Sequence, residues 1–95
     1  MLSSAQRAKL RSMASTMEPI VHVGKEGISP NLIKQVDDAL EARELIKGTV
    51  LQNSAYTAKE ALAELAEAVN AQAVQSIGRK FVLYRPSQKN PKIEL

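Results

Sequence analysis

The stretch that most restricts the fold is residues 20–33, IVHVGKEGISPNLI, which changes from a strand pattern to a helix start within a few residues. The β-branched residues of IVHV favour an extended strand. Ser29 is suited to cap a helix, and Pro30 fits its first position, where a missing N–H costs nothing. The two elements are joined by a turn with a glycine at each end, Gly24 and Gly27.

Helix starts and apolar strands alternate along the rest of the chain. Ser3 and Gln6 have the spacing of a capping box and predict a helix to about Ala14. Thr57 and Glu60 predict another in the same way, to about Val69. The expected buried faces, at helical spacing, are Leu10, Met13, Ala14 and Met17 in the first helix, Leu32, Val36, Ala39 and Leu40 (widened by Ile33) in the second, and Leu62, Leu65, Ala66 and Val69 in the third.

Three further strand segments complete the pattern. One runs from about Leu45 to Leu51, and two more, AVQSI and KFVLYR, flank Gly78-Arg79, which suits a type II′ hairpin. The order α-β-α-β-α-β-β predicts a single α/β domain over residues 1–95 with a mixed four-stranded sheet and an irregular tail over residues 86–95. Strands separated by a helix should be parallel with right-handed crossovers, and the last pair antiparallel. Periodicity does not determine which sheet face the first helix covers.

Composition excludes several classes of site. The chain has no cysteine and one histidine, so disulfides, thiolate metal sites and multi-histidine metal sites are excluded within one chain. No apolar run approaches the ~20 residues that span a bilayer, and because no apolar h-region precedes a cleavage site, we expect no secretory signal. The basic N-terminus resembles a transit peptide, but its cap and apolar face favour a folded helix. We expect a cytoplasmic protein without metal, cofactor, membrane contact or small-molecule substrate.

Charge is unevenly distributed along the 95 residues. Residues 1–15 carry +3, residues 16–70 carry −4 and residues 71–95 carry +4. If the two ends meet in space, they form a patch that attracts a polyanion; the alternative is ordinary scatter over a solvated surface. Asp37, Asp38, Glu41 and Glu44 on the second helix are most simply a solvated face, and make its body a poor nucleic-acid surface.

The Gly24–Gly27 turn has two interpretations. The turn does not match a dinucleotide-binding motif, because the third glycine of that motif is missing. It does not match a P-loop either, because the sequence has no Gly-Lys-Ser/Thr. A GXXG clamp, which lets a nucleic-acid backbone approach closely, is a better match, with Lys25 as a mobile charge and the N-terminus of the next helix favouring phosphate. Glu26 opposes this unless it points away. A plain turn remains the simpler interpretation of so short a motif.

The two interpretations make different predictions for alanine substitutions. A turn glycine with positive φ should cost stability when replaced, whereas a clamp glycine should cost RNA affinity. Gly27 lies nearer Ser29, so we expect Gly27→Ala to lose affinity beyond any unfolded fraction, with an unchanged native state.

In combination, PIVHVGKEGISPNLIKQVDDALEARELIKGTV and IGRKFVLYRPS resemble the CRM domain (chloroplast RNA splicing and ribosome maturation), in its stand-alone bacterial form, the YhbY family. The resemblance implies a fold similar to the C-terminal domain of bacterial translation initiation factor three. It also implies RNA binding and association with large-subunit precursors, and its GxxG turn corresponds to Gly24, Lys25, Glu26 and Gly27. The chain departs from the family at Gly48, where a bulge or a close contact is expected, and in QNSAYTAKEA.

Other residues carry weaker signals. His22 alternates with Val21 and Val23 and is expected to be a partly exposed strand residue without a catalytic partner. Phe81 is expected in the core, and Tyr84 to pack rather than to stack a base; three aromatics do not make a base-stacking sheet.

We therefore expect a non-enzymatic protein that binds structured ribosomal RNA in large-subunit precursors. Two alternatives remain open: a protein-interaction module with incidental RNA affinity, and an enzyme that uses His22. The expected RNA surface comprises the Gly24–Gly27 turn and the basic residues Arg7, Arg11, Arg79, Lys80, Arg85 and Lys89.

Overall fold

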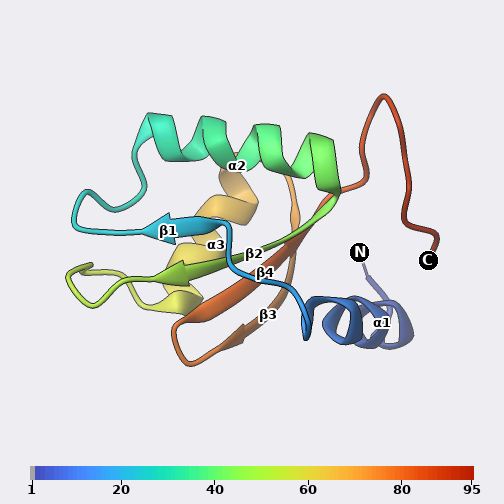
Figure 1. The fold of residues 1–95 in the computed structure, drawn as a ribbon, viewed down its shortest axis with the longest axis horizontal. Helices are drawn as coiled ribbons and strands as arrows, with labels where there is room; N and C mark the ends of the chain where they lie inside the picture. Colours follow the sequence, from blue (N-terminus) through green and yellow to red (C-terminus); the bar gives the residue numbers. More distant parts are fainter. Residues whose placement is uncertain (1) are drawn as a thin grey trace.

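The computed structural model describes residues 2–95 and has the predicted order of elements (Figure 1). Ser3 and Thr57 form complete capping boxes, and the Ser29 hydroxyl accepts the Leu32 N–H, so each predicted cap is confirmed. The elements are α1 (Ser4–Ala14), β1 (Val21–Val23), α2 (Pro30–Arg43), β2 (Leu45–Val50), α3 (Ala58–Ala68), β3 (Gln72–Ile77) and β4 (Lys80–Tyr84).

The four strands form one mixed sheet in the order β1-β2-β4-β3. β1 is parallel to β2, and β4 is antiparallel to both β2 and β3, so the last strand of the chain lies between two earlier ones. Gly78 has a φ of +58° at the first of two turn residues, and Arg79 is not in the left-handed region. This confirms the predicted type II′ hairpin, which needs positive φ at its first turn position only.

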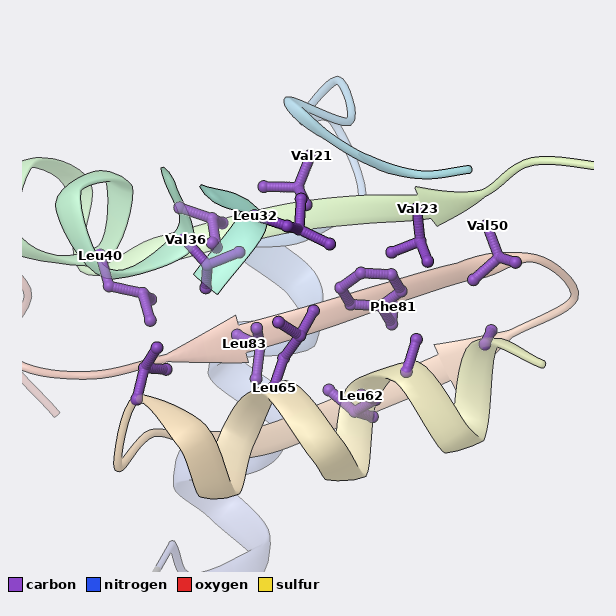
Figure 2. Close-up of a cluster of buried hydrophobic side chains, with 14 residues drawn as sticks. Val21, Val23, Leu32, Val36, Leu40, Val50, Leu62, Leu65, Phe81 and Leu83 are labelled. Carbon is purple, nitrogen blue, oxygen red and sulfur yellow. The ribbon is translucent and has the colours of Figure 1, made fainter. Parts of the chain in front are cut away.

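The helices cover both faces of the sheet. α2 and α3 pack on one face over a cluster with Phe81 in its middle (Figure 2). α1 packs on the other face, where Leu10 and Ala14 contact Leu45, Val82 and Tyr84. Tyr84 is thus buried, and its expected packing role is confirmed. Met13, expected on the buried face of α1, is instead 38% exposed, whereas its neighbour Ala14 is buried against the sheet.

Gly48 on β2 makes room for an aromatic ring. A Cβ at this position would collide with the Phe81 ring of the paired strand β4. The close contact expected at Gly48 is therefore with a core side chain of the same protein.

α1 is attached to the sheet through a β-bulge. The register of β3 against β4 shifts between Ala73 and Gln75, leaving Val74 as the extra residue. The Arg7 guanidinium donates hydrogen bonds to the carbonyls of Ala73 and Val74, which satisfies groups that a bulge leaves unpaired.

The tail after β4 has neither helix nor strand, but two glutamates hold it in place. Glu44 is fully buried and accepts the N–H groups of Ser87, Lys92 and Ile93 at 2.8, 2.6 and 2.8 Å. Glu41 accepts the Ser87 hydroxyl and the Gln88 N–H. The prediction that both glutamates belong to a solvated face is therefore wrong, because they bind the tail.

The charge of Glu44 is stabilised where it lies. Burial alone would raise the pKa of Glu44, but its three N–H donors and the nearby Lys92 charge outweigh burial and lower that pKa below the usual 4.5. At Glu41 the Ser87 hydroxyl is the main cause of a lowered pKa. Both carboxylates are therefore charged at neutral pH.

Among the helices of residues 2–95, none combines the length and the apolarity needed to cross a bilayer. The same residues contain no group of three or more acidic or histidine side chains placed to hold a metal ion.

Candidate nucleic-acid interface

The Gly24–Gly27 segment is a tight turn between β1 and α2. The Gly27 N–H donates to the Gly24 carbonyl at 3.0 Å, which places Lys25 and Glu26 at the two exposed central positions. α2 begins three residues later, at Pro30, which has no N–H, and the Leu32 N–H is already bound by Ser29. Helix geometry leaves the Asn31 N–H without an intrahelical acceptor, so positive potential persists beside the turn.

Gly27 is required by the fold itself. Its φ is +69°, and a Cβ there would lie 2.8 Å from Cε2 of Tyr56, a residue of the β2–α3 loop. The Tyr56 ring packs against the main core, and interaction with the nearby Glu64 carboxylate raises the Tyr56 pKa. An alanine at Gly27 would be strained and would displace Tyr56, which counts against the expectation of an unchanged native-state spectrum for Gly27→Ala.

Gly24 has no such structural requirement. Its φ is outside the left-handed region, and a Cβ would meet its nearest neighbour, Cδ1 of Leu51, at an ordinary 3.5 Å. The turn interpretation thus accounts for Gly27 but not for Gly24. Neither backbone conformation nor local packing therefore requires a glycine at Gly24.

The turn borders an open hollow of about 430 Å³ between α2 and the β2–α3 loop. Three exposed amide side chains line it: Asn31 and Gln35, one helical turn apart on α2, and Asn53 on the loop. Leu32 and Leu51 supply apolar surface. In nucleic-acid complexes amide side chains bond to base edges and GXXG turns hold the backbone, so the chemistry of this lining is compatible with a nucleotide.

Two of the expected cations lie at the same end of the sheet as the turn. The Val50 N–H donates to the Arg79 carbonyl, and Leu51 lines both the hollow described above and a neighbouring one that contains Arg79. Figure 1 shows the β1–α2 turn, the β2–α3 loop and the β3–β4 hairpin gathered at one end of the molecule. Lys25, Arg79 and Lys80 therefore belong to one end, and Arg11 shares a third hollow with Lys80.

The other expected cations lie elsewhere or are engaged within the fold. Arg85 is only 15% exposed and pairs with Asp37 at 2.6 Å. Lys89 lies in the tail beside Asp37, Asp38 and Glu41, in an acidic setting. Arg7 is bound to the β3 bulge. The structure thus does not bring the six basic residues together in one patch.

Several residues of the hollow beside the Gly24–Gly27 turn were not predicted from local sequence patterns. Asn31, Gln35, Asn53 and Leu51 carry no motif, although Asn31 and Gln35 do have the i, i+4 spacing of one helix face. Asn53 comes from a different loop and meets the α2 residues only in the folded protein. His22 is exposed, as expected, and it also lines the hollow.

Comparisons with known proteins identify the family and support the fold. A model of the CRS1 / YhbY (CRM) domain matches residues 2–85. The chain is 46% identical over 95 residues to "Probable RNA-binding protein YqeI" of Bacillus subtilis, covering 100% of this chain and 99% of that protein. It is 33% identical over 94 residues to a Haemophilus influenzae protein named "RNA-binding protein", covering 99% and 94%. The solution structure of SAV1595 from Staphylococcus aureus superposes with a TM-score of 0.82 and 49% identity, covering 100% of this chain and 99% of that one.

Proposed function

This chain belongs to the CRS1 / YhbY (CRM) domain family, and from that premise we propose that it binds structured ribosomal RNA in precursors of the large ribosomal subunit. Two relatives whose names describe RNA binding span nearly the whole chain, which supports RNA as the ligand. The choice of ribosomal precursors rests on the resemblance to stand-alone bacterial members of the family.

The observation that carries the proposal is the unexplained glycine at Gly24. It lies beside the exposed Lys25, at the edge of a hollow lined by free amides and next to a helix N-terminus. Each of these features favours a phosphate with its nucleotide, and neither the turn nor the packing needs a glycine at this position.

Binding, without a chemical step, is the proposed mode of action. His22 is exposed, and no described residue donates to or accepts from its side chain. An imidazole without an orienting partner lacks the arrangement that general base catalysis requires. The protein then acts by holding RNA, with phosphate at the turn and a base in the hollow.

Lys25→Ala tests the phosphate contact. Because a lysine recognises phosphate as a point charge, the variant should weaken binding about equally for all RNA sequences. It should also reduce the slope of log affinity against log salt concentration by about one. Affinity for several structured RNAs should be measured by fluorescence anisotropy across a salt series.

Lys34→Ala is the matched control. Lys34 is an exposed lysine of α2 that pairs with Asp38 and does not line the hollow. Its removal changes net charge by the same amount, so it separates a specific contact from a general loss of charge. Equal salt slopes for wild type and Lys25→Ala would refute the phosphate contact.

A further inference from the structure

We propose that the hollow between the C-terminal end of α1 and the uncovered part of the sheet is a second RNA-contact site, which holds one nucleotide of a strand already bound at the Gly24–Gly27 turn. The inference rests on the proposed function and extends it to the opposite face of the sheet. The site is called the α1 hollow below, and its lining residues are Arg11, Ala14, Ser15, Lys47, Gln75, Ile77, Lys80 and Val82.

The charge of the α1 hollow is entirely positive. Arg11 comes from α1, Lys47 from β2 and Lys80 from β4, and no carboxylate lines the hollow. The side-chain salt bridges within residues 2–95 are Lys34–Asp38 and Arg85–Asp37, so Arg11 and Lys80 are not neutralised by an acidic partner there. An anionic occupant would complement all three charges.

Lys47 fixes one wall of the α1 hollow. Its ammonium group donates to the carbonyls of Ala14 and Met17, at 3.1 and 3.4 Å, where α1 ends. This contact holds the end of the helix to the sheet and keeps a charge at the rim. Arg11 and Lys80 are exposed and remain available to a ligand.

The floor of the α1 hollow is apolar, which favours a ligand with an apolar part as well as a negative charge. Ala14 and Val82 are buried beneath it, and Ile77 is 65% exposed. A nucleotide combines a charged phosphate with a flat, largely apolar base, and matches a cationic rim above an apolar floor. The volume of about 260 Å³ suits one such unit and is small for an amphipathic protein helix.

Continuity with the turn makes RNA the favoured occupant over an acidic protein segment. Lys80 is adjacent to Arg79, which lies at the hairpin tip beside Leu51 and hence next to the Gly24 hollow. A strand leaving the turn therefore meets Arg79 first and then Lys80 before it reaches Arg11. Positive side chains mark this route from one sheet face to the other.

The test compares short and long RNA. Single-stranded oligouridylates of about four nucleotides, the span of a GXXG clamp, should occupy the turn alone, and those of about twelve should reach both sites. For the long RNA, Arg11→Ala/Lys80→Ala should reduce the log–log salt slope by about 1.4, or about 0.7 for each phosphate contact to a single strand. The same double variant should leave the affinity for the short RNA unchanged.

Ile77→Ser tests the apolar floor separately. The exposed position of Ile77 makes the substitution compatible with folding, which circular dichroism should verify. It should weaken binding of the long RNA with no change in salt slope, because no charge is removed. Photocrosslinking of 4-thiouridine placed in the long RNA should label the hairpin peptide that contains Ile77 and Lys80.

The control double variant is Lys34→Ala/Arg43→Ala, which removes two exposed cations of α2 outside the α1 hollow. If the long RNA binds the Arg11/Lys80 variant with wild-type affinity and slope, the proposal is overturned, and an intact Lys25 effect would leave the proposed function standing. A protein partner would be favoured by two results together. The protein would bind polyglutamate, with Arg11→Ala/Lys80→Ala abolishing that binding, and the effect of the double variant on RNA affinity would be the same for short and long RNA. This combination would also overturn the proposal. Failure of both oligouridylates to bind would overturn the second site alone, since the proposed function is tested separately by the Lys25 effect on structured RNA.

Discussion

At the scale of single residues, the two glycines of the turn differ in backbone conformation and in surroundings. Gly27 adopts a conformation that L residues disfavour and lies against Tyr56, whereas Gly24 has ordinary φ and ordinary space around it. Identical residues, three apart, are therefore constrained by different physical requirements. The requirement at Gly27 is one of stability, and the one that we propose for Gly24 is ligand affinity.

Gly24→Ala and Gly27→Ala should separate these requirements. Gly27→Ala should lower the free energy of unfolding by about 1–2 kcal/mol, the cost of a left-handed L residue, plus the displacement of Tyr56. Gly24→Ala should change stability by less than about 0.5 kcal/mol and reduce RNA affinity about tenfold, equivalent to ~1.4 kcal/mol. Urea unfolding and RNA titration of each variant are the measurements.

The affinity of Gly24→Ala decides the outcome, because that variant is expected to remain folded. Wild-type affinity in a folded Gly24→Ala protein would mean that no ligand backbone approaches this position. The Gly27→Ala result then serves as the positive control for strain.

At the scale of elements, the tail depends on the carboxyl end of α2. Glu44 has a φ of +68°, unusual for a side-chain-bearing residue, and its carboxylate is buried among the tail's N–H groups. A left-handed residue here turns the chain from α2 directly into β2, and hydrogen bonds from the tail help to hold it there. Residues 87–93 are thereby ordered without forming a helix or strand.

Glu44→Gln should destabilise the protein at neutral pH by about 1–3 kcal/mol, because an amide leaves at least one buried N–H without a good acceptor. The lowered Glu44 pKa means that the stabilisation by charge is present above about pH 4.5 and is lost as pH falls through the folded-state pKa. The difference from wild type should therefore shrink below pH 4.5. Amide hydrogen exchange of residues 87–93 and urea unfolding, each across pH, measure this.

Glu67→Gln provides the comparison, since Glu67 is exposed on α3 and lies outside the tail contacts. It should leave stability and tail protection near wild type at every pH. A tail whose amides exchange equally fast in wild type and Glu44→Gln would contradict the role given to Glu44.

At the scale of the whole molecule, the fold sorts the basic residues into separate places. The parallel β1–β2 pair puts the turn and the β2–α3 loop at one end, and the antiparallel β4 brings the hairpin tip to them (Figure 1). Arg85 and Lys89 lie beyond the other end of β4, beside the acids of α2. RNA binding should therefore depend strongly on one end of the molecule.

The placement of the free basic residues at one end gives a prediction about binding to large-subunit precursor particles. The protein should co-sediment with large-subunit precursors in a sucrose gradient, and Lys25→Ala should reduce the bound fraction because phosphate contacts supply much of the affinity. Arg85→Ala would disturb the fold, so Lys89→Ala is the suitable variant for the far end, and it should sediment as wild type does. Wild-type protein found only at the top of the gradient after crosslinking would refute the association.

The sequence alone determined the features that depend on neighbours along the chain. Ser3, Ser29 and Thr57 start helices through bonds to backbone three residues away, and Gly78 makes its turn through its own φ, so each could be predicted. The GxxG turn and the family were likewise predictable, because their motifs are local.

Tertiary structure alone decided the features that depend on residues far apart in sequence. Arg7 is paired with carbonyls 66 and 67 residues away, Glu44 with amides more than forty residues away, and Gly27 with Tyr56 on another loop. From charge and spacing in the sequence, all three of Arg7, Arg85 and Lys80 are predicted to be surface cations. Only the packing of α1 on the second sheet face, and of β4 between β2 and β3, separates cations that hold the fold together from those free to meet a ligand.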